Sequence, residues 1–405
     1  MKAEVSPWSA RTIAFLGAEA LSAIGSWATI VAIWAYAAYR YDATPGQVAF
    51  FGIAFAVPGV VLGPVSGTVV DRLGPKATLA FAKVVGIAAS LALLSADDFG
   101  TLSVLSGFHG VASAFSHPAL QSMPPRLVSD HHLARTNALV SLTDELAIVL
   151  GPAAAGVAIA VFGFRGAFVF DAFTYAVGLA VLPLVRLRPV ATAHGGPHPS
   201  VRIRDALEGW KLIIASGVLR RTVACGFSVH VLYGFALLAE PLYVRDALHR
   251  SEDVFAALQV AFGICLVMGG IAVARLGERL ASFGWVAAGV AASGATAVVY
   301  LGTPWIAVAF AGVALWGVAT AAISGPSRTV LQRGSPEAVH GRVLAAGGMA
   351  ENGAQLLGLI VGGALVAALG VRSSVLGVGA VVSAAAIGLY VADRAERARA
   401  ATPAL

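Results

Sequence analysis

The sequence predicts an all-α membrane protein in which twelve transmembrane helices form two six-helix bundles. Three observations support this: an apolar composition, a series of long apolar runs, and a loop that occurs twice. Apolar residues make up 58% of the 405 residues and charged residues only 12%, and the mean hydropathy is +0.82. A water-soluble chain carries roughly 25% charged residues. With so few charges the folded chain lacks a water-facing surface, so lipid must surround most of it.

The repeated loop indicates that one structural unit occurs twice. Residues 67–76 read GTVVDRLGPK and residues 270–279 read GIAVARLGER, with five of ten positions identical and an offset of 203, half of the chain. A second match, at an offset of 207, pairs residues 141–152 with residues 348–359. We infer a parallel repeat of two six-helix units. The second match makes Asp144 equivalent to Glu351, Gly151 to Gly358 and Gly156 to Gly363.

The apolar runs define the expected helices, because each holds the ~20 residues that a bilayer crossing needs. In order along the chain, the expected spans are 12–39, 46–70, 77–96, 101–122, 136–162, 165–185, 220–244, 253–274, 280–301, 304–326, 342–369 and 372–392. The expected domains are residues 1–186, a cytoplasmic linker at 187–219, and residues 220–405.

The linker is the one long break in hydrophobicity. It opens with Pro, Gly and His residues, and then places Leu207, Trp210 and Ile214 at helical spacing. This pattern predicts an amphipathic helix on the inner membrane face. A solvated connector with a turn or two of helix is the alternative.

The distribution of basic residues predicts the orientation. With both termini in the cytoplasm, the cytoplasmic side holds 22 of the 27 Lys and Arg residues and the other side holds five. This asymmetry is the positive-inside pattern of a multi-pass protein of the cytoplasmic membrane. It accounts for the net charge of +6 without a nucleic-acid partner. No cleavable targeting segment is expected, because the first apolar run is too long for one.

Residues 67–76 have the form G-x-x-x-D-R-x-G-x-[KR], which resembles the loop between the second and third helices of the major facilitator superfamily. Residues 25–27 (GSW), 118–121 (PALQ), 137–139 (NAL) and 150–152 (LGP) also resemble the exporter branch that includes macrolide and siderophore efflux proteins, and this similarity covers most of the N-terminal half. The resemblance implies a conformational gate in which Asp71 pairs with the start of the eleventh helix, where the helix dipole is positive. The expected gate residues are Gly67, Asp71, Arg72, Gly74, Lys76 and Arg342.

Acids inside the expected spans are candidates for proton coupling, because an ionised carboxylate there costs several kcal/mol without a partner. Glu19, Asp144 and Glu351 each lie eight or nine residues from an arginine at the inner surface, about 12–14 Å deep and close to the midplane. We expect these three to bind protons or a cationic substrate. Glu145, rotated ~100° from Asp144 on a helix, is an alternative to it. Asp171 and Glu240 lie nearer the outer end, which predicts structural or gating roles.

Other positions complete the expected site. His109 in the fourth span either titrates or acts as a neutral hydrogen-bonding residue. Gly151, Pro152 and Gly156 resemble the fifth-helix motif of antiporters, where Pro kinks the helix and Gly permits close contact, although ordinary packing explains them equally well. Aromatic residues on helices that line the family's cavity would suit a bulky apolar ligand, with lipid-facing positions as the alternative: Trp27, Trp34, Phe115, Phe227, Tyr233 and Trp316.

The sequence predicts a secondary active transporter and not an enzyme. It has no Walker-type phosphate loop, no hydrolase nucleophile motif and no closely spaced set of His and Cys metal ligands, so we expect no cofactor and no metal. We expect a monomer that exports a bulky, partly apolar small molecule in exchange for protons, surrounded by membrane lipids. A lipid or lysolipid flippase and an importer are alternatives on the same fold. A non-transporting sensor or scaffold is the alternative of another class.

Overall fold

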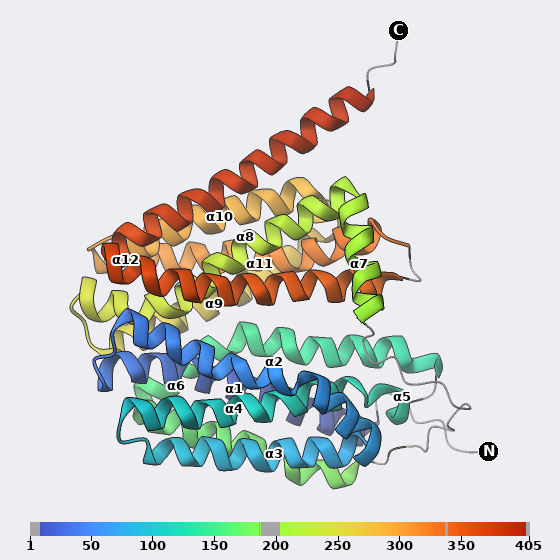
Figure 1. Cartoon of the computed structure of the whole chain (residues 1–405), viewed down its shortest axis with the longest axis vertical. Coiled ribbons are helices and arrows are strands. Elements are labelled where there is room, and N and C mark those ends of the chain that lie inside the picture. The colour runs from blue at the N-terminus through green and yellow to red at the C-terminus, as the bar shows by residue number, and fades with distance from the viewer. Residues whose placement is uncertain (1–8, 129, 186, 188–202, 337–338, 402–405) are drawn as a thin grey trace. The chain divides into compact units, whose positions relative to one another are not determined.

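The computed structural model describes residues 9–128, 130–185, 187, 203–336 and 339–401, and every regular element in these ranges is helical (Figure 1). The first half of the chain contains Ala10–Arg40 (α1), Pro45–Leu73 (α2), Pro75–Ala92 (α3), Phe99–Gln121 (α4), the short Pro124–Leu127 (α5) and Asp130–Val181 (α6). The second half contains Ile203–Ala215 (α7), Gly217–Leu242 (α8), Glu252–Leu276 (α9), Phe283–Gly302 (α10), Ile306–Arg333 (α11) and His340–Ala401 (α12).

The long elements α6 and α12 are each two helices joined at a glycine. Gly163 in α6 has φ 69° and Gly370 in α12 has φ 76°, conformations that residues with a Cβ rarely adopt. Figure 1 shows the two segments of α12 meeting at a sharp bend. Divided at these glycines, the described residues contain twelve long helical segments, which confirms the predicted all-α membrane fold. The two glycines are 207 residues apart, the offset of the second sequence match.

Eight helical stretches of the described residues are long and apolar enough to cross a membrane. Two of the eight, Leu150–Leu184 and Arg342–Arg399, continue across the glycine turns and so contain parts of two segments each. Helix α4 is absent from the eight because four serines and two histidines reduce its mean hydropathy. A helix of this composition needs protein neighbours for its polar groups.

The chain forms two compact units, which we call the N-terminal unit (residues 1–43 and 50–200) and the C-terminal unit (residues 44–49 and 201–405). In the N-terminal unit α1 packs along α6, and α3 packs against α4 and α6. In the C-terminal unit α8 packs along α12, and α10 packs against α11 and α12. Equivalent helices therefore choose equivalent partners, as a parallel repeat requires.

Equivalent glycines bring the first and fifth helices of each unit together. An added Cβ at Gly151 would overlap Trp27 of α1, and one at Gly358 would overlap the backbone of Val231 in α8. Only glycine leaves room for such an approach between two membrane helices. The sequence match between these glycines thus corresponds to the same packing contact in both units.

Helix α7 occupies the C-terminal part of the linker and packs against α8 and α12. Gly209 lies against the backbone of Arg342, and Ile213 is buried together with Leu219 of α8. Ile214 on the other face is exposed. The described part of the linker is therefore a helix docked on the C-terminal unit, whereas residues 188–202 and the side chain of Leu207 lie outside the described residues.

Candidate functional site

The loop between α2 and α3 is a turn around one glycine. Gly74 has φ 83° and is followed by Pro75, which begins α3 at a position that needs no backbone donor. The ammonium group of Lys76 donates hydrogen bonds to the backbone oxygens of Val185 (2.8 Å) and Pro183 (3.4 Å). Lys76 thereby fastens the start of the third helix to the end of the sixth.

The other expected gate residues are divided between the two units. Gly67 lies within α2, Arg72 is exposed near its end, and the side chain of Asp71 lies outside the described residues. Arg342 stands near the start of α12 in the C-terminal unit, where Gly209 of α7 covers its backbone. The pairing of the loop with the start of α12 stays a prediction.

Glu19 forms an ion pair with a lysine inside the N-terminal unit. The Nζ atom of Lys83 on α3 lies 2.8 Å from Oε2 of Glu19 on α1, and it donates a second hydrogen bond of 2.9 Å to Oγ of Ser22. It also lies 5.4 Å from the ring centroid of Tyr175, a cation–π contact. Both charged side chains are buried, so each supplies the compensating charge that the other needs. Oε1 of Glu19 is buried without a hydrogen-bond partner among the described residues.

A second polar cluster surrounds Asp171 of α6. Nε2 of His109 on α4 lies 2.8 Å from Oδ2 of Asp171, and both side chains are fully buried. Ser90 of α3 donates a hydrogen bond of 2.7 Å to the same oxygen. Oγ of Ser26 on α1 lies 3.4 Å from Oδ1 of Asp171 and 2.9 Å from the hydroxyl oxygen of Tyr175. Side chains of α1, α3 and α4 thus converge on one carboxylate of α6.

The two clusters follow one face of each helix, because their members recur three, four or seven residues apart. These faces carry Glu19, Ser22 and Ser26 on α1, Lys83, Gly86 and Ser90 on α3, and Asp171, Tyr175 and Gly178 on α6. Glycine leaves room on α3, since an added Cβ at Gly86 would lie 2.6 Å from the Tyr175 ring. We call the following set the polar network: Glu19, Ser22, Ser26, Lys83, Ser90, His109, Asp171 and Tyr175.

Sequence reasoning missed Lys83. The expected distribution of basic residues includes Lys83 on the cytoplasmic side, and this is wrong, because Lys83 is 1% exposed inside α3. The expected number of basic residues on that side is therefore 21 and not 22. Lys83 is the one lysine of four that falls inside an expected span, and this position could have indicated that it is buried and needs an acidic partner. Asp171 was expected to have a structural or gating role, and its pairing with His109 could not be read from either helix alone.

Comparison with known proteins identifies the family. The sequence model of the Major Facilitator Superfamily matches residues 15–358, a range that contains the repeated loop and the whole polar network. The chain belongs to the major facilitator superfamily. Members of this superfamily are transporters, and the chain is accordingly a multi-pass membrane transporter and not an enzyme.

Relatives of this superfamily member cover most of its length. It is 25% identical over 374 residues to the MFS-type transporter YfiS of Bacillus subtilis, which covers 89% of this chain and 88% of YfiS. It is 23% identical over 372 residues to the multidrug efflux pump Tap of Mycobacterium tuberculosis, with coverage of 89% and 88%. A solved bacterial homologue of the human lysosomal transporter Spinster shares the fold, with a TM-score of 0.71, 15% identity and coverage of 94% and 96%.

Of the acids expected in the fifth and eleventh helices of this transporter, only Glu351 has a side chain among the described residues. Glu351 lies against α8, since an added Cβ at Gly226 would lie 2.8 Å from its Oε1 atom. Nδ1 of His230 lies 2.8 Å from the backbone oxygen of the same glycine. The side chains of Asp144 and Glu145 lie outside the described residues, so the choice between them stays open.

Glu240 connects two helices of the C-terminal unit near the end of α8. Nε2 of Gln259 on α9 donates a hydrogen bond of 3.2 Å to Oε2 of Glu240 on α8. Both side chains are buried. The contact ties α8 to α9, and the choice between a structural and a gating role for Glu240 stays a prediction.

The aromatic residues expected in the cavity of the N-terminal unit differ in their surroundings. The rings of Trp34 and Phe51 meet edge to face at 5.4 Å, and those of Phe115 and Phe81 do the same. Such pairs are typical of a packed interior. Trp27 is half-buried where it contacts the fifth helix. Trp34 and Phe115 therefore pack against neighbouring helices, and Trp27 keeps part of its side chain exposed.

In the C-terminal unit, Trp316 is 4% exposed, and its Nε1–H group donates a hydrogen bond of 2.9 Å to Ser293. The ring centroid of Tyr233 lies 6.1 Å from that of Trp316. Phe227 on α8 is 39% exposed. Trp316 is thus a core residue of its unit, whereas Phe227 and half-buried Tyr233 have surface available.

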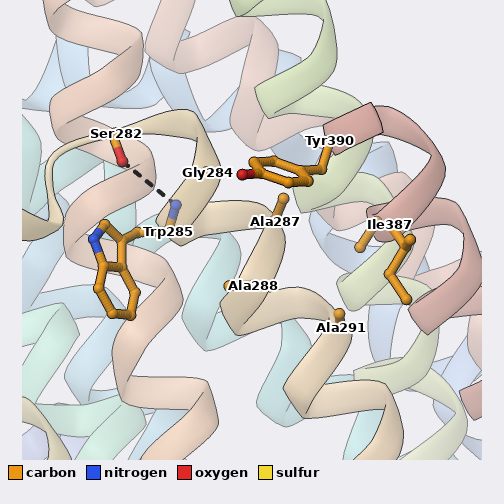
Figure 2. A pocket seen from close by; sticks show the side chains of 9 residues that line it. Ser282, Gly284, Trp285, Ala287, Ala288, Ala291, Ile387 and Tyr390 are labelled. Carbon is orange, nitrogen blue, oxygen red and sulfur yellow. Dashed lines mark hydrogen bonds between the residues drawn. The ribbon is translucent and has the colours of Figure 1, made fainter. Parts of the chain in front are cut away.

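An open groove of about 540 Å³ lies between the start of α10 and the second segment of α12. Figure 2 shows Tyr390 reaching across it towards Gly284, with Ile387 and Ala291 further along. Among the described residues that line it there is no carboxylate, histidine, lysine or arginine. The groove belongs to the C-terminal unit and carries no charge to couple to protons, so the polar network remains the candidate site.

Proposed function

We propose that this protein is a proton-coupled exporter of a bulky, partly apolar small molecule, such as a drug, a siderophore or a secondary metabolite. It works as a monomer by alternating access in the cytoplasmic membrane, with both termini in the cytoplasm. The similarity to a multidrug efflux pump supports the direction and the substrate class. The excess of basic residues in the loops on one side supports the orientation. The buried pair of Glu19 and Lys83 carries the proposal of proton coupling.

The ion pair links protonation to conformation. If Glu19 takes a proton, the ammonium group of Lys83 loses its compensating charge, and a lone charge buried among helices is costly. A proton on Glu19 is therefore compatible only with a state in which water or another group solvates Lys83. By linkage, the proton then favours the state that opens the bundle at this point, and release of the proton favours the closed pair.

The substrate would act on the same pair. Oε1 of Glu19 has no partner among the described residues, so it is available to a donor or cationic group of a ligand. A ligand that engages Glu19 competes with the proton for one carboxylate, and that competition is the basis of exchange. Half-buried Trp27, eight residues along α1, provides an aromatic surface for an apolar part of the ligand.

The loop at 67–76 is proposed to gate the cytoplasmic side. Asp71 would pair with the start of α12 near Arg342 in one state only, because a helix N-terminus and an arginine both attract a carboxylate. Lys76 holds the loop against the end of the sixth helix, so that movement of the N-terminal unit carries the loop with it. Asp144 and Glu351 remain proposed as further coupling sites on the fifth and eleventh helices.

The test uses inside-out membrane vesicles from cells that express the protein, with ethidium as the probe and an imposed pH gradient. We expect the gradient to drive ethidium uptake in the wild type. Glu19→Gln keeps the shape of the side chain but cannot titrate, so gradient-driven uptake should be lost while downhill exchange of ethidium persists. Glu252→Gln, at the start of α9, is the control and should transport normally.

Other outcomes identify the alternatives. Glutamine keeps an acceptor oxygen at this position, so loss of both gradient-driven uptake and exchange in folded Glu19→Gln would show that substrate binding requires the charge of Glu19. Uptake by right-side-out vesicles indicates an importer, and movement of a fluorescent lysophospholipid in place of ethidium indicates a flippase. If the wild type moves no probe at any pH gradient, a sensor or scaffold is favoured and the proposed function is wrong.

A further inference from the structure

Nδ1 of His109 is a buried nitrogen without a hydrogen-bond partner among the described residues. The other ring nitrogen, Nε2, faces Oδ2 of Asp171 at 2.8 Å. The Asp171 carboxylate also accepts a hydrogen bond from the hydroxyl group of Ser90 and lies next to the hydroxyl group of Ser26. It therefore acts as a hydrogen-bond acceptor for the groups around it. Nε2 of His109 must then carry the hydrogen, which leaves a free lone pair on Nδ1 whenever the ring is neutral.

The charge of this pair differs from that of Glu19 and Lys83. Lysine and glutamate compensate each other, whereas Asp171 beside a neutral histidine leaves one negative charge buried in a membrane helix bundle. Such a charge is costly even when hydrogen bonds surround it. One proton on Nδ1 converts the pair into imidazolium and carboxylate and removes the net charge. Protonation of Nδ1 therefore uses the free lone pair of His109 and also removes the uncompensated charge.

The printed contacts of the described residues lead from the pair to two charged groups, both of which belong to the polar network. From α3, Lys83 approaches through the ring of Tyr175, which lies 6.0 Å from the His109 ring. Tyr175 of α6 contacts Ser26, and Glu19 of α1 lies beyond Lys83. From α2 the neighbour is the ring of Phe55, stacked at 6.0 Å, which is uncharged. The ring of Tyr175 thus lies between the pair and the charge of Lys83, and a proton on Glu19 would leave that charge uncompensated.

We propose that His109 and Asp171 form a second proton-binding site of this transporter, with Nδ1 of His109 as the atom that takes the proton. The site is separate from Glu19 but electrostatically coupled to it through Lys83. A part in transport rests on the proposed function above, whereas proton binding itself does not. With both sites used in one cycle, two protons cross the membrane for each substrate molecule.

Proton binding is tested without transport, by NMR of purified protein in micelles with isotopically labelled histidine. One of the nine histidine signals should vanish in His109→Gln. We expect that signal to keep a hydrogen on Nε2 throughout and to gain one on Nδ1 as the pH is lowered within the folded range. In Asp171→Asn the imidazolium form should be lost, because a buried cation without a counter-charge is costly. His117→Gln, at an exposed position of the same helix, is the control and should leave the signal intact.

A His109 signal that keeps one form throughout the folded pH range overturns the proposal. If His109→Gln does not fold, the His109 signal is assigned by substituting the other eight histidines one at a time. The loss of the imidazolium form in Asp171→Asn then still tests the proposal. The role in transport is tested by the number of protons moved per ethidium, which should fall from two to one in His109→Gln. An unchanged number removes the site from the cycle. A wild type that moves no protons refutes the proposed function instead, and leaves the NMR result to decide on the site.

Discussion

Nζ of Lys83 lies 2.8 Å from Oε2 of Glu19, so the acid of the first helix has its counter-charge on the third. Both side chains are buried, so water cannot solvate the charge of either one if the other is removed. Removal of either side chain therefore leaves the other as an uncompensated buried charge, which destabilises the folded protein.

Replacing one member of the pair should destabilise the protein more than replacing both. Lys83→Met leaves Glu19 as a lone buried charge, and we expect a loss of about 3–5 kcal/mol in the free energy of unfolding. Glu19→Gln combined with Lys83→Met leaves no charge, so the double variant should recover much of that loss. Thermal unfolding of the four proteins in detergent measures the coupling. Additive losses would show that the two side chains do not interact.

Asp71→Asn should leave the protein folded and inserted but slow transport at least tenfold. The substitution removes the negative charge that is proposed to hold the loop against the start of α12 in one state of the cycle. The rate of ethidium uptake and the yield of folded protein are measured together. Glu278→Gln, in the second copy of the loop, provides a matched control, because it too removes an acid from a loop of this form. Wild-type rates in Asp71→Asn would exclude the loop from gating.

Gly358→Ala should destabilise the C-terminal unit, because the added methyl group overlaps the backbone of Val231. We expect a cost of about 1–3 kcal/mol for this overpacking. Gly353→Ala, on the same helix and with open space around it, should be neutral or stabilising by up to about 1 kcal/mol. Gly151→Ala should repeat the loss in the N-terminal unit. Equal unfolding temperatures for the variants at Gly358 and Gly353 would contradict the packing argument.

The orientation is tested with single cysteines in a background without Cys225 and Cys265. Asp97→Cys lies in the loop before α4, which is expected to face outwards, and should react with a membrane-impermeant thiol reagent in intact cells. Ser200→Cys in the expected cytoplasmic linker should react only after the cells are opened. The reverse pattern would place both termini on the outside and refute the proposed topology.

Acid should weaken the contact between α8 and the end of α12. Arg221 donates a hydrogen bond to Glu396, and this bond, with the positive charge of Arg221, lowers the pKa of Glu396 from its ordinary value of 4.5. A carboxyl whose pKa is lowered by folding stabilises the protein above its unfolded pKa, and this contribution disappears as the pH falls through the folded pKa. The difference in unfolding temperature between the wild type and Glu396→Gln should therefore shrink on acidification. A difference independent of pH would contradict the assignment.

The sequence alone determined the fold class, the repeat and the family, because lipid imposes long apolar runs and the duplicated loop marks the same turn twice. The breaks at Gly163 and Gly370 fall in the predicted gaps, since a positive φ favours glycine at a sharp turn. The polar network was decided by tertiary structure. Lys83 meets Glu19 across 64 residues of chain, and His109 meets Asp171 across 62. Helical spacing can show that polar residues share a face, but which faces turn towards each other depends on how the helices pack.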